Sequence, residues 1–195
     1  MTKNDTRIIC MIRHGKTTQN IHKRIQGRKN FQLSDTGREE ALKTAFYLKK
    51  NDKDWDIIYS SPLDRAKDTA KIIASTINYQ GEIIIDDAFQ ERDFGVSEGM
   101  DVCPEVFVKV LDDSWEGLEK TKDIMARVVG GINKIISTSN YKKILIISHA
   151  HAINSVLLSI DNTRRMNSPM FNCSMNYIKY ENGKLSIIEA NKMPN

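Results

Sequence analysis

The sequence has no long apolar run, and this absence excludes a membrane-spanning helix. Its longest strictly apolar stretches hold only about five residues, as at 8–12, whereas a membrane-spanning helix needs about 20. The opening residues, MTKND, also lack the apolar segment of a secretory signal. We therefore expect a protein that is neither inserted in a membrane nor exported.

Cysteine is scarce. The three cysteines, Cys10, Cys103 and Cys173, are odd in number and widely spaced, which argues against a disulfide framework or a zinc pair. Cys10 lies within an apolar stretch and is expected in the core. A chain of this kind suits a reducing compartment, so the sequence predicts a cytoplasmic location.

An excess of one charge is also missing. Lysine and arginine outnumber aspartate and glutamate by 29 to 25, a net charge of +4, and no run of lysine and arginine exceeds two residues. This pattern argues against nucleic acid as a partner and suits a basic pocket for a small anion. The 195 residues contain no repeats and no linkers rich in proline or glycine. A single domain over 1–195 is therefore predicted.

Apolar stretches typical of strands alternate with amphipathic patterns typical of helices. A helix is expected after Ser61, which would cap it, with Pro62 in its first position. The pair Gly130-Gly131 falls inside a predicted helix and indicates close packing against a neighbour. Asn182-Gly183 predicts a tight hairpin turn. The expected strands are 7–13, 56–60, 82–86 and 142–148. The other expected helices are 35–50, 116–138 and 151–160.

This alternation predicts the fold class. Strands separated by helices indicate an α/β domain with three layers, doubly wound, in which helices cover both faces of a mostly parallel sheet and a hairpin ends the chain. In such sheets the ligand lies beyond the carboxyl ends of the strands. Residues at those ends are therefore the candidates for a functional site.

Histidines and arginines follow the expected strands. Arg13 and His14 come at the end of the first strand, His149 at the end of 142–148, and Arg65 in the first turn of the helix after the second strand. Two histidines and two arginines at one sheet edge would form a pocket for a doubly charged oxyanion, because arginine grips phosphate in two places. The alternative for each histidine is an ordinary core or surface position.

Phosphoryl transfer needs a nucleophile, charge stabilisation and a proton donor. His14 can be the nucleophile as a neutral imidazole, which neighbouring arginines favour. Glu91 is a candidate donor, because a short connection joins it to the third strand; the alternative is a solvated loop carboxylate. Arg65 has an alternative too, an ion pair with Asp64 or Asp68.

Five blocks in these regions resemble the histidine phosphatase superfamily, the phosphoglycerate mutase-like enzymes. They occur in the family's order and span 7 to about 155. The matching residues are Arg13-His14-Gly15 with Asn20, Ile25-Gln26-Gly27 with Leu33, Ser34 and Gly37, Ser60 to Ala66 with Thr69-Ala70, Glu91-Arg92-Asp93-Phe94-Gly95 with Glu98-Gly99, and Ile147-Ser148-His149.

The resemblance implies a doubly wound fold and a mechanism without metal. His14 would carry the phosphoryl group and Glu91 would donate a proton and later activate water. The remaining expected site residues are Arg13, Arg65 and His149 around the phosphoryl group, and Asn20, Gln26, Gly27 and Lys16 for substrate binding.

Two positions depart from the family pattern. Lys16 stands where an acidic or amide residue is usual and would add positive potential near the pocket. Ala150 replaces the glycine that usually follows the second histidine, and its methyl group would narrow the site. His151 is not part of the family pattern and is interpreted as a structural residue at a helix start.

The segment 100–116 bears on the reaction. Mutases of this family usually carry a longer, basic insertion there, but this segment holds one lysine and five acidic residues. It is expected to form part of a lid, with an apolar underside from Val106, Phe107, Val110 and Leu111. The sequence thus favours a phosphatase acting on a small phosphorylated metabolite over a cofactor-dependent phosphoglycerate mutase.

Two other classes stay open. A metal-dependent hydrolase could use His14, His149 and His151 as ligands. A non-catalytic module that binds a phosphorylated ligand would keep the fold without turnover. A monomer and a homodimer are equally compatible with the sequence.

Overall fold

The computed structural model describes residues 5–194, apart from the side chain of Phe107. A six-stranded sheet has the order β3-β2-β4-β1-β5-β6. The first four of these strands are mutually parallel. β5 pairs antiparallel with β1, and β6 pairs antiparallel with β5. The strands are β1 (Thr6–Arg13), β2 (Ile57–Ser60), β3 (Ile83–Ile85), β4 (Lys143–Ser148), β5 (Met175–Glu181) and β6 (Lys184–Lys192).

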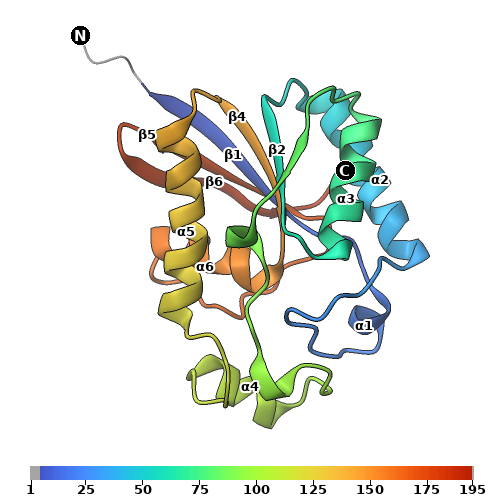
Figure 1. Ribbon diagram of the computed structural model, residues 1–195, viewed down its shortest axis with the longest axis vertical. Helices are drawn as coiled ribbons and strands as arrows, with labels where there is room; N and C mark the ends of the chain where they lie inside the picture. The colour runs from blue at the N-terminus through green and yellow to red at the C-terminus, as the bar shows by residue number, and fades with distance from the viewer. Residues whose placement is uncertain (1–4, 195) are drawn as a thin grey trace.

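Helices cover both faces of the sheet (Figure 1). Along β1, Ile9 and Met11 pack with the helices of one face, whereas Cys10 and Ile12 pack with those of the other. Strands buried on both faces are apolar throughout instead of alternating, which explains the unbroken run at 8–12. The helices are α2 (Asp35–Asn51) and α3 (Asp64–Thr76) on one face, and α5 (Thr121–Thr138) and α6 (Ala150–Ile160) on the other.

The sheet has a switch point between its two central strands. β1 and β4 pair in parallel, with Arg13 opposite Ser148. The chain then leaves β1 toward the face of α2, and leaves β4 toward the opposite face, where α6 lies. Such a divergence opens a crevice at the carboxyl ends of the two strands. The residues that follow Arg13 and Ser148 therefore meet at this crevice.

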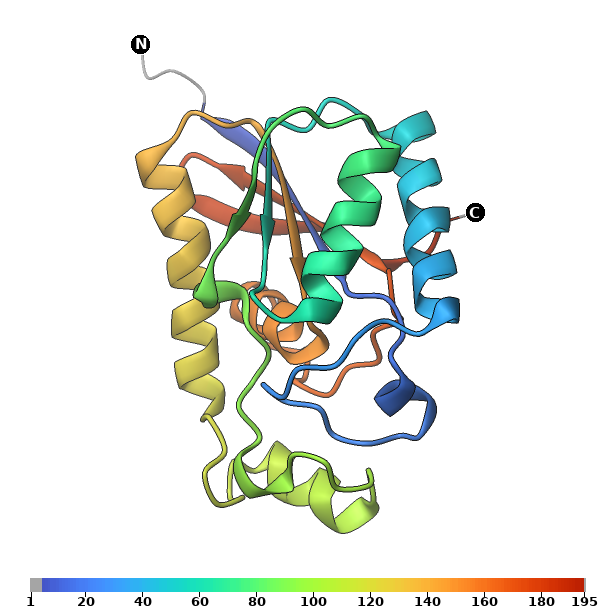
Figure 2. The ribbon, with the colours of Figure 1, turned by 45° about the vertical axis from the view of Figure 1, so that its right-hand side comes forward.

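Short elements follow the carboxyl ends of the parallel strands, and α1 and α4 lie at the end of the molecule away from the N-terminus (Figures 1 and 2). They are α1 (Thr18–Ile21), the 3₁₀ turns η1 (Asp87–Phe89) and η2 (Gly95–Ser97), and α4 (Pro104–Leu111). A small core holds this end together, formed by Ile25, Phe94, Val106, Val110 and Leu118.

The predicted fold class is confirmed, and most strands and helices lie within two residues of their expected bounds. The hairpin is confirmed as well, since Asn182 and Gly183 both have positive φ, 50° and 88°. No helix in the described part of the chain has the length and apolar character that a membrane crossing requires.

Three details of the prediction were wrong. The helix expected over 116–138 starts only at Thr121. Ser61 does not cap the following helix, which begins at Asp64 with Leu63 in the cap position. Of the glycine pair, only Gly131 meets a neighbour: a β-carbon there would lie 2.6 Å from that of Ala88, whereas one on Gly130 would meet nothing within 4 Å.

Candidate active site

His14 lies in the crevice with only 2% of its surface exposed. Its Nδ1 is 2.7 Å from the carbonyl oxygen of Gly15, and a carbonyl can only accept, so Nδ1 carries the ring proton. Nε2 is therefore a lone-pair nitrogen, and it accepts a hydrogen bond from Nε of Arg65 at 3.3 Å. Burial first, then Arg65 and Arg13, lower the pKa of His14 well below its ordinary value. The imidazole is neutral, with one fixed tautomer.

Close backbone packing explains why glycine follows His14. A β-carbon on Gly15 would lie 2.3 Å from the carbonyl oxygen of Gly37, and one on Gly37 would lie 2.0 Å from that of Lys16. The N-terminus of α2 thus rests directly on the turn after β1. The backbone N–H of Gly15 also donates to the Thr69 hydroxyl at 3.0 Å. These contacts hold the carbonyl that orients His14.

His149 comes from the neighbouring strand end, and its ring lies 5.1 Å from that of His14. Its Nε2 is 2.8 Å from the Ser61 hydroxyl. Its Nδ1 is buried and has no hydrogen-bond partner among residues 5–194. Burial, then the charges of Arg65 and the other nearby groups, lower the pKa of His149 well below its ordinary value. A second neutral imidazole thus faces the first.

Two arginines supply positive charge beside these rings. Arg65 is 1% exposed, and it donates to the carbonyls of Gly27 at 2.7 Å and Lys29 at 2.8 Å. Burial lowers the pKa of Arg65 to about 10, so it stays protonated at neutral pH. The alternative of an ion pair with Asp64 or Asp68 is wrong, because those carboxylates pair with other cations.

Arg13 points toward the same crevice. Its Nη1 donates to the carbonyl of Met170, and its Nε has no partner among the described residues. Burial lowers the pKa of Arg13. Buried donors of this kind are usually satisfied, and an oxyanion in the crevice would satisfy Arg13 Nε.

Glu91 is 8% exposed, so the alternative of a solvated loop carboxylate is wrong. Its Oε1 accepts the backbone N–H groups of Arg92 at 2.9 Å and Ala152 at 3.2 Å. Ala152 lies in the first turn of α6, where free N–H groups and the helix dipole attract a carboxylate. The second carboxyl oxygen has no hydrogen bond to any residue in the described chain.

A pocket of about 320 Å³ joins these groups, near the lower end of the usual size for small-molecule sites. The expected residues that line it are Arg13, His14, Asn20, Gln26, Gly27, Arg65 and Glu91. His149 lies behind them, in contact with the ring of His14. The lid side includes Phe94, Val102, Val106 and Val110.

The expected substrate-binding residues divide into two groups. Asn20 caps α1 by accepting from the backbone N–H of Thr17 at 3.1 Å, and Gln26 accepts from the Thr17 hydroxyl at 2.9 Å; both side chains line the pocket. Lys16 does not. Its ammonium group lies 3.2 Å from Glu40, and this pairing holds it outside the pocket.

The lid differs in part from expectation. Val106 and Val110 are buried over the pocket as predicted, but Leu111 is 38% exposed. The side chain of Phe107 lies outside the described residues. Among those residues, no group of three or more histidine, cysteine or acidic side chains is arranged to hold a metal ion.

Comparison with known proteins agrees with this geometry. Residues 9–192 match the histidine phosphatase superfamily (branch 1). The chain belongs to this superfamily. A curated relative, an uncharacterized phosphatase called PhoE of Bacillus subtilis, is 33% identical over 94% of this chain and 93% of its own length. A broad-specificity phosphatase of Saccharomyces cerevisiae is 30% identical over 88% of this chain and 79% of its own.

Solved structures of phosphatases and of a phosphoglycerate mutase share the fold. A phosphoglycerate mutase from Bacillus anthracis superimposes with a TM-score of 0.87 at 21% identity, covering 97% of this chain and 95% of that one. At this identity the likeness shows the fold alone. The fold that holds His14 is therefore shared with this phosphoglycerate mutase.

Two pocket features escaped the sequence prediction. His151, interpreted as structural, lines the pocket with its ring 5.0 Å from that of Phe94, and burial lowers the pKa of His151 to about 4. The rule that residues after a strand's carboxyl end lie at the site predicted His149, and it applies equally to His151, two residues further on. Ser61, expected as a helix cap, instead contacts His149, and no spacing signal indicated this. Ala150 lines the pocket from the first turn of α6.

Proposed function

We propose that this protein hydrolyses phosphomonoesters through a phosphohistidine formed at Nε2 of His14. The observation that carries the proposal is the fixed tautomer: Nδ1–H donates to the Gly15 carbonyl, and the Nε2 lone pair faces a buried arginine. A neutral imidazole held in this way is a competent nucleophile.

The phosphoryl group would be bound by Arg13, Arg65 and His149. The unpartnered Nε of Arg13 and the place of His149 beside the His14 ring support this assignment, since preorganised donors stabilise charge that develops in a transition state. Asn20 would assist them, and Gln26 and Gly27 would contact the substrate from the adjoining loop. We leave Lys16 out of this set because Glu40 neutralises it away from the pocket.

Glu91 would act twice. In the first step the bond between Nε2 of His14 and phosphorus forms while the ester P–O bond breaks, and the protonated Glu91 gives its proton to the leaving oxygen. In the second step the Glu91 carboxylate takes a proton from water, the water oxygen bonds to phosphorus and the N–P bond breaks. The free carboxyl oxygen of Glu91 at the pocket supports both roles.

Phosphatase activity is favoured over phosphoglycerate mutase-type transfer. The lid contributes valines to the pocket, and the pocket residue Arg24 is paired with Asp101, so a second site for a substrate carboxylate has little support. The names of the two curated relatives point the same way. We further propose one domain over 1–195, a cytoplasmic location and a small phosphorylated metabolite as substrate.

Hydrolysis of an aryl phosphate in the presence of a chelator tests the proposal, with wild type, His14→Ala and the exposed-histidine control His22→Ala side by side. We expect wild type and His22→Ala to turn over equally and His14→Ala to lose at least ~10⁴-fold in kcat. Loss of wild-type activity on chelation would favour the metal-dependent hydrolase. If none of the three turns over the ester, phosphoglycerates are tried next as mutase substrates. Binding of phosphate without turnover of either substrate would favour the non-catalytic module.

A further inference from the structure

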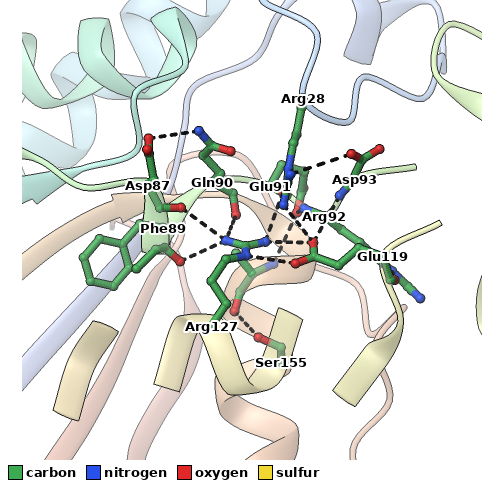
Figure 3. Close-up of polar contacts among 12 residues, drawn as sticks. Arg28, Asp87, Phe89, Gln90, Glu91, Arg92, Asp93, Glu119, Arg127 and Ser155 are labelled. Carbon is green, nitrogen blue, oxygen red and sulfur yellow. Dashed lines mark hydrogen bonds and ion pairs between the residues drawn. The ribbon is translucent and has the colours of Figure 1, made fainter. Parts of the chain in front are cut away.

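Arg127 on α5 uses every donor of its guanidinium group. Nε and Nη2 bind the two carboxylate oxygens of Glu119 at 2.9 and 2.8 Å. Nη1 donates to the carbonyls of Ala88 at 3.0 Å and Gln90 at 3.1 Å, and Nη2 also reaches the carbonyl of Glu91 at 3.3 Å. Figure 3 shows the guanidinium between this backbone and the Glu119 carboxylate. A planar five-donor fork suits such a site, whereas lysine offers a point charge.

The backbone that Arg127 binds carries Glu91. This segment, from η1 to η2, belongs to no strand of the sheet, and in the described chain its bridge partner is Leu118, opposite Phe94. Among the described residues, the carbonyls of Ala88, Gln90 and Glu91 accept no backbone N–H. Side chains supply hydrogen bonds here that a sheet would otherwise provide. Arg127 makes most of them, beside one from Ser148 to the Phe89 carbonyl at 2.8 Å and one from Arg28 to the Glu91 carbonyl at 3.4 Å.

Glu119 joins this segment to the pocket loop. It accepts the backbone N–H of Asp93 at 3.2 Å and contacts Arg28 at 3.3 Å. Arg28 lies next to Gly27, whose carbonyl holds Arg65. Glu119 also orients Arg127 through the paired contact described above. The Arg127–Glu119 pair therefore lies behind Glu91, and neither residue lines the pocket.

We propose that Arg127 and Glu119 are positioning residues that hold Glu91 where it can pass a proton to the leaving group. This inference rests on the proposed role of Glu91. Two anchors define the carboxylate: Arg92 and Ala152 bind its Oε1, and Arg127 fixes the main chain that bears it. Without Arg127 this main chain keeps only the hydrogen bonds from Ser148 and Arg28, so the second anchor is weakened, and the phosphoryl-binding groups at the strand ends keep their own contacts.

The test compares esters whose leaving groups differ in their need for a proton. We expect Arg127→Met to lower kcat/KM for an alkyl phosphate about 100-fold, because displacement by about 1 Å can cost that much, and for a 4-nitrophenyl ester less than about 3-fold. Arg127→Lys should behave like Arg127→Met, since it keeps the charge but loses the fork. Glu91→Gln should show the same pattern, and adding Arg127→Met to it should cost little more.

Arg7 provides the matched control. It is also buried, donates to the carbonyl of Ser139 and pairs with Asp5, but it lies at the opposite end of β1. Arg7→Met should lower thermal stability without changing the ratio of alkyl to aryl activity. If Arg127→Met does not fold, Glu119→Gln serves instead, with the same selective loss expected.

The outcomes separate the two proposals. Equal losses on both esters, no loss on either, or the same selectivity in Arg7→Met would overturn the positioning role. A selective loss of alkyl-ester activity in Glu91→Gln, without such a loss in the Arg127 and Glu119 variants, would also overturn the positioning role. The proposed role of Glu91 would then stand. No selectivity in Glu91→Gln itself would instead overturn the proposed proton donor, and the positioning role with it.

Discussion

The pocket has two unlike halves: a base at the strand ends and a lid formed by the segment 100–116. In the base, His14, Arg65 and His149 are at most 2% exposed, and each is held by a hydrogen bond. In the lid, Val102 and Val108 are 52% and 58% exposed. A buried base held by hydrogen bonds keeps one arrangement, which suits the phosphoryl group that all substrates share. Exposed segments with fewer contacts open and change conformation more easily. We infer that the base performs the chemistry and the lid selects the ester.

Replacing an arginine of the base and an arginine that contacts the lid should produce the largest contrast. Arg65→Met removes a charged donor beside Nε2 of His14, so kcat should fall about 10²–10³-fold for every phosphomonoester. Arg24→Met, at the lid side, should keep kcat within about 3-fold and change KM to an extent that differs between esters. Steady-state kinetics on a panel of esters measures both. Similar kcat losses in the two variants would break the distinction.

The base should also make the protein sensitive to acid. Its two buried histidines have folded pKa values well below the ordinary value, so below pH about 6.5 the unfolded chain binds protons that the folded chain does not. The contribution of each neutral histidine to the free energy of unfolding is therefore fully present above that pH. It is lost as pH falls, by about 1.4 kcal/mol per pH unit for each histidine. Chemical unfolding between pH 7 and pH 5 measures this slope, which is proportional to the number of protons taken up on unfolding. His14→Gln should lower that number by one. An unchanged slope in that variant would contradict the neutral assignment.

The glycine pair on α5 tests how tightly this helix packs against η1, in the segment before Glu91. Gly131→Ala would push against Ala88, in the segment that leads to Glu91, and should destabilise the protein by about 1–3 kcal/mol. Gly130→Ala meets open space and should stabilise it by up to about 1 kcal/mol. Thermal or denaturant unfolding of both variants decides the matter. Equal effects of the same sign would show that close packing at Gly131 is unimportant.

The smallest effect is expected in the lid. Val106→Ala removes two methyl groups from the small core over the pocket, so KM should rise several-fold for esters that reach the lid, by about 1 kcal/mol of binding. The value of kcat should change less than about 2-fold, because the base is untouched. A large fall in kcat with unchanged KM would place the lid in the chemistry instead.

The same division explains what could be predicted from the sequence. His14, Arg65 and His149 follow apolar strands, and the strand-end rule brings such residues together whatever their neighbours are. Glu91 and α4 lie in segments whose paths depend on side chains distant in sequence, such as Arg127, and no local period encodes those contacts. Lys16 was expected at the pocket, and no local pattern indicates its pairing with Glu40, which lies 24 residues further on in α2. His151 follows the same strand end as His149, and the strand-end rule could have placed it at the pocket.

The most direct test of the mechanism is to trap the phosphorylated enzyme. Turnover of a phosphomonoester quenched in alkali preserves phosphohistidine, and ³¹P NMR of the quenched protein distinguishes the two ring nitrogens. Our account predicts one phosphoryl group on Nε2 of His14 in wild type and none in His14→Ala. Phosphorylation at Nδ1, at another residue, or at none during active turnover would contradict it.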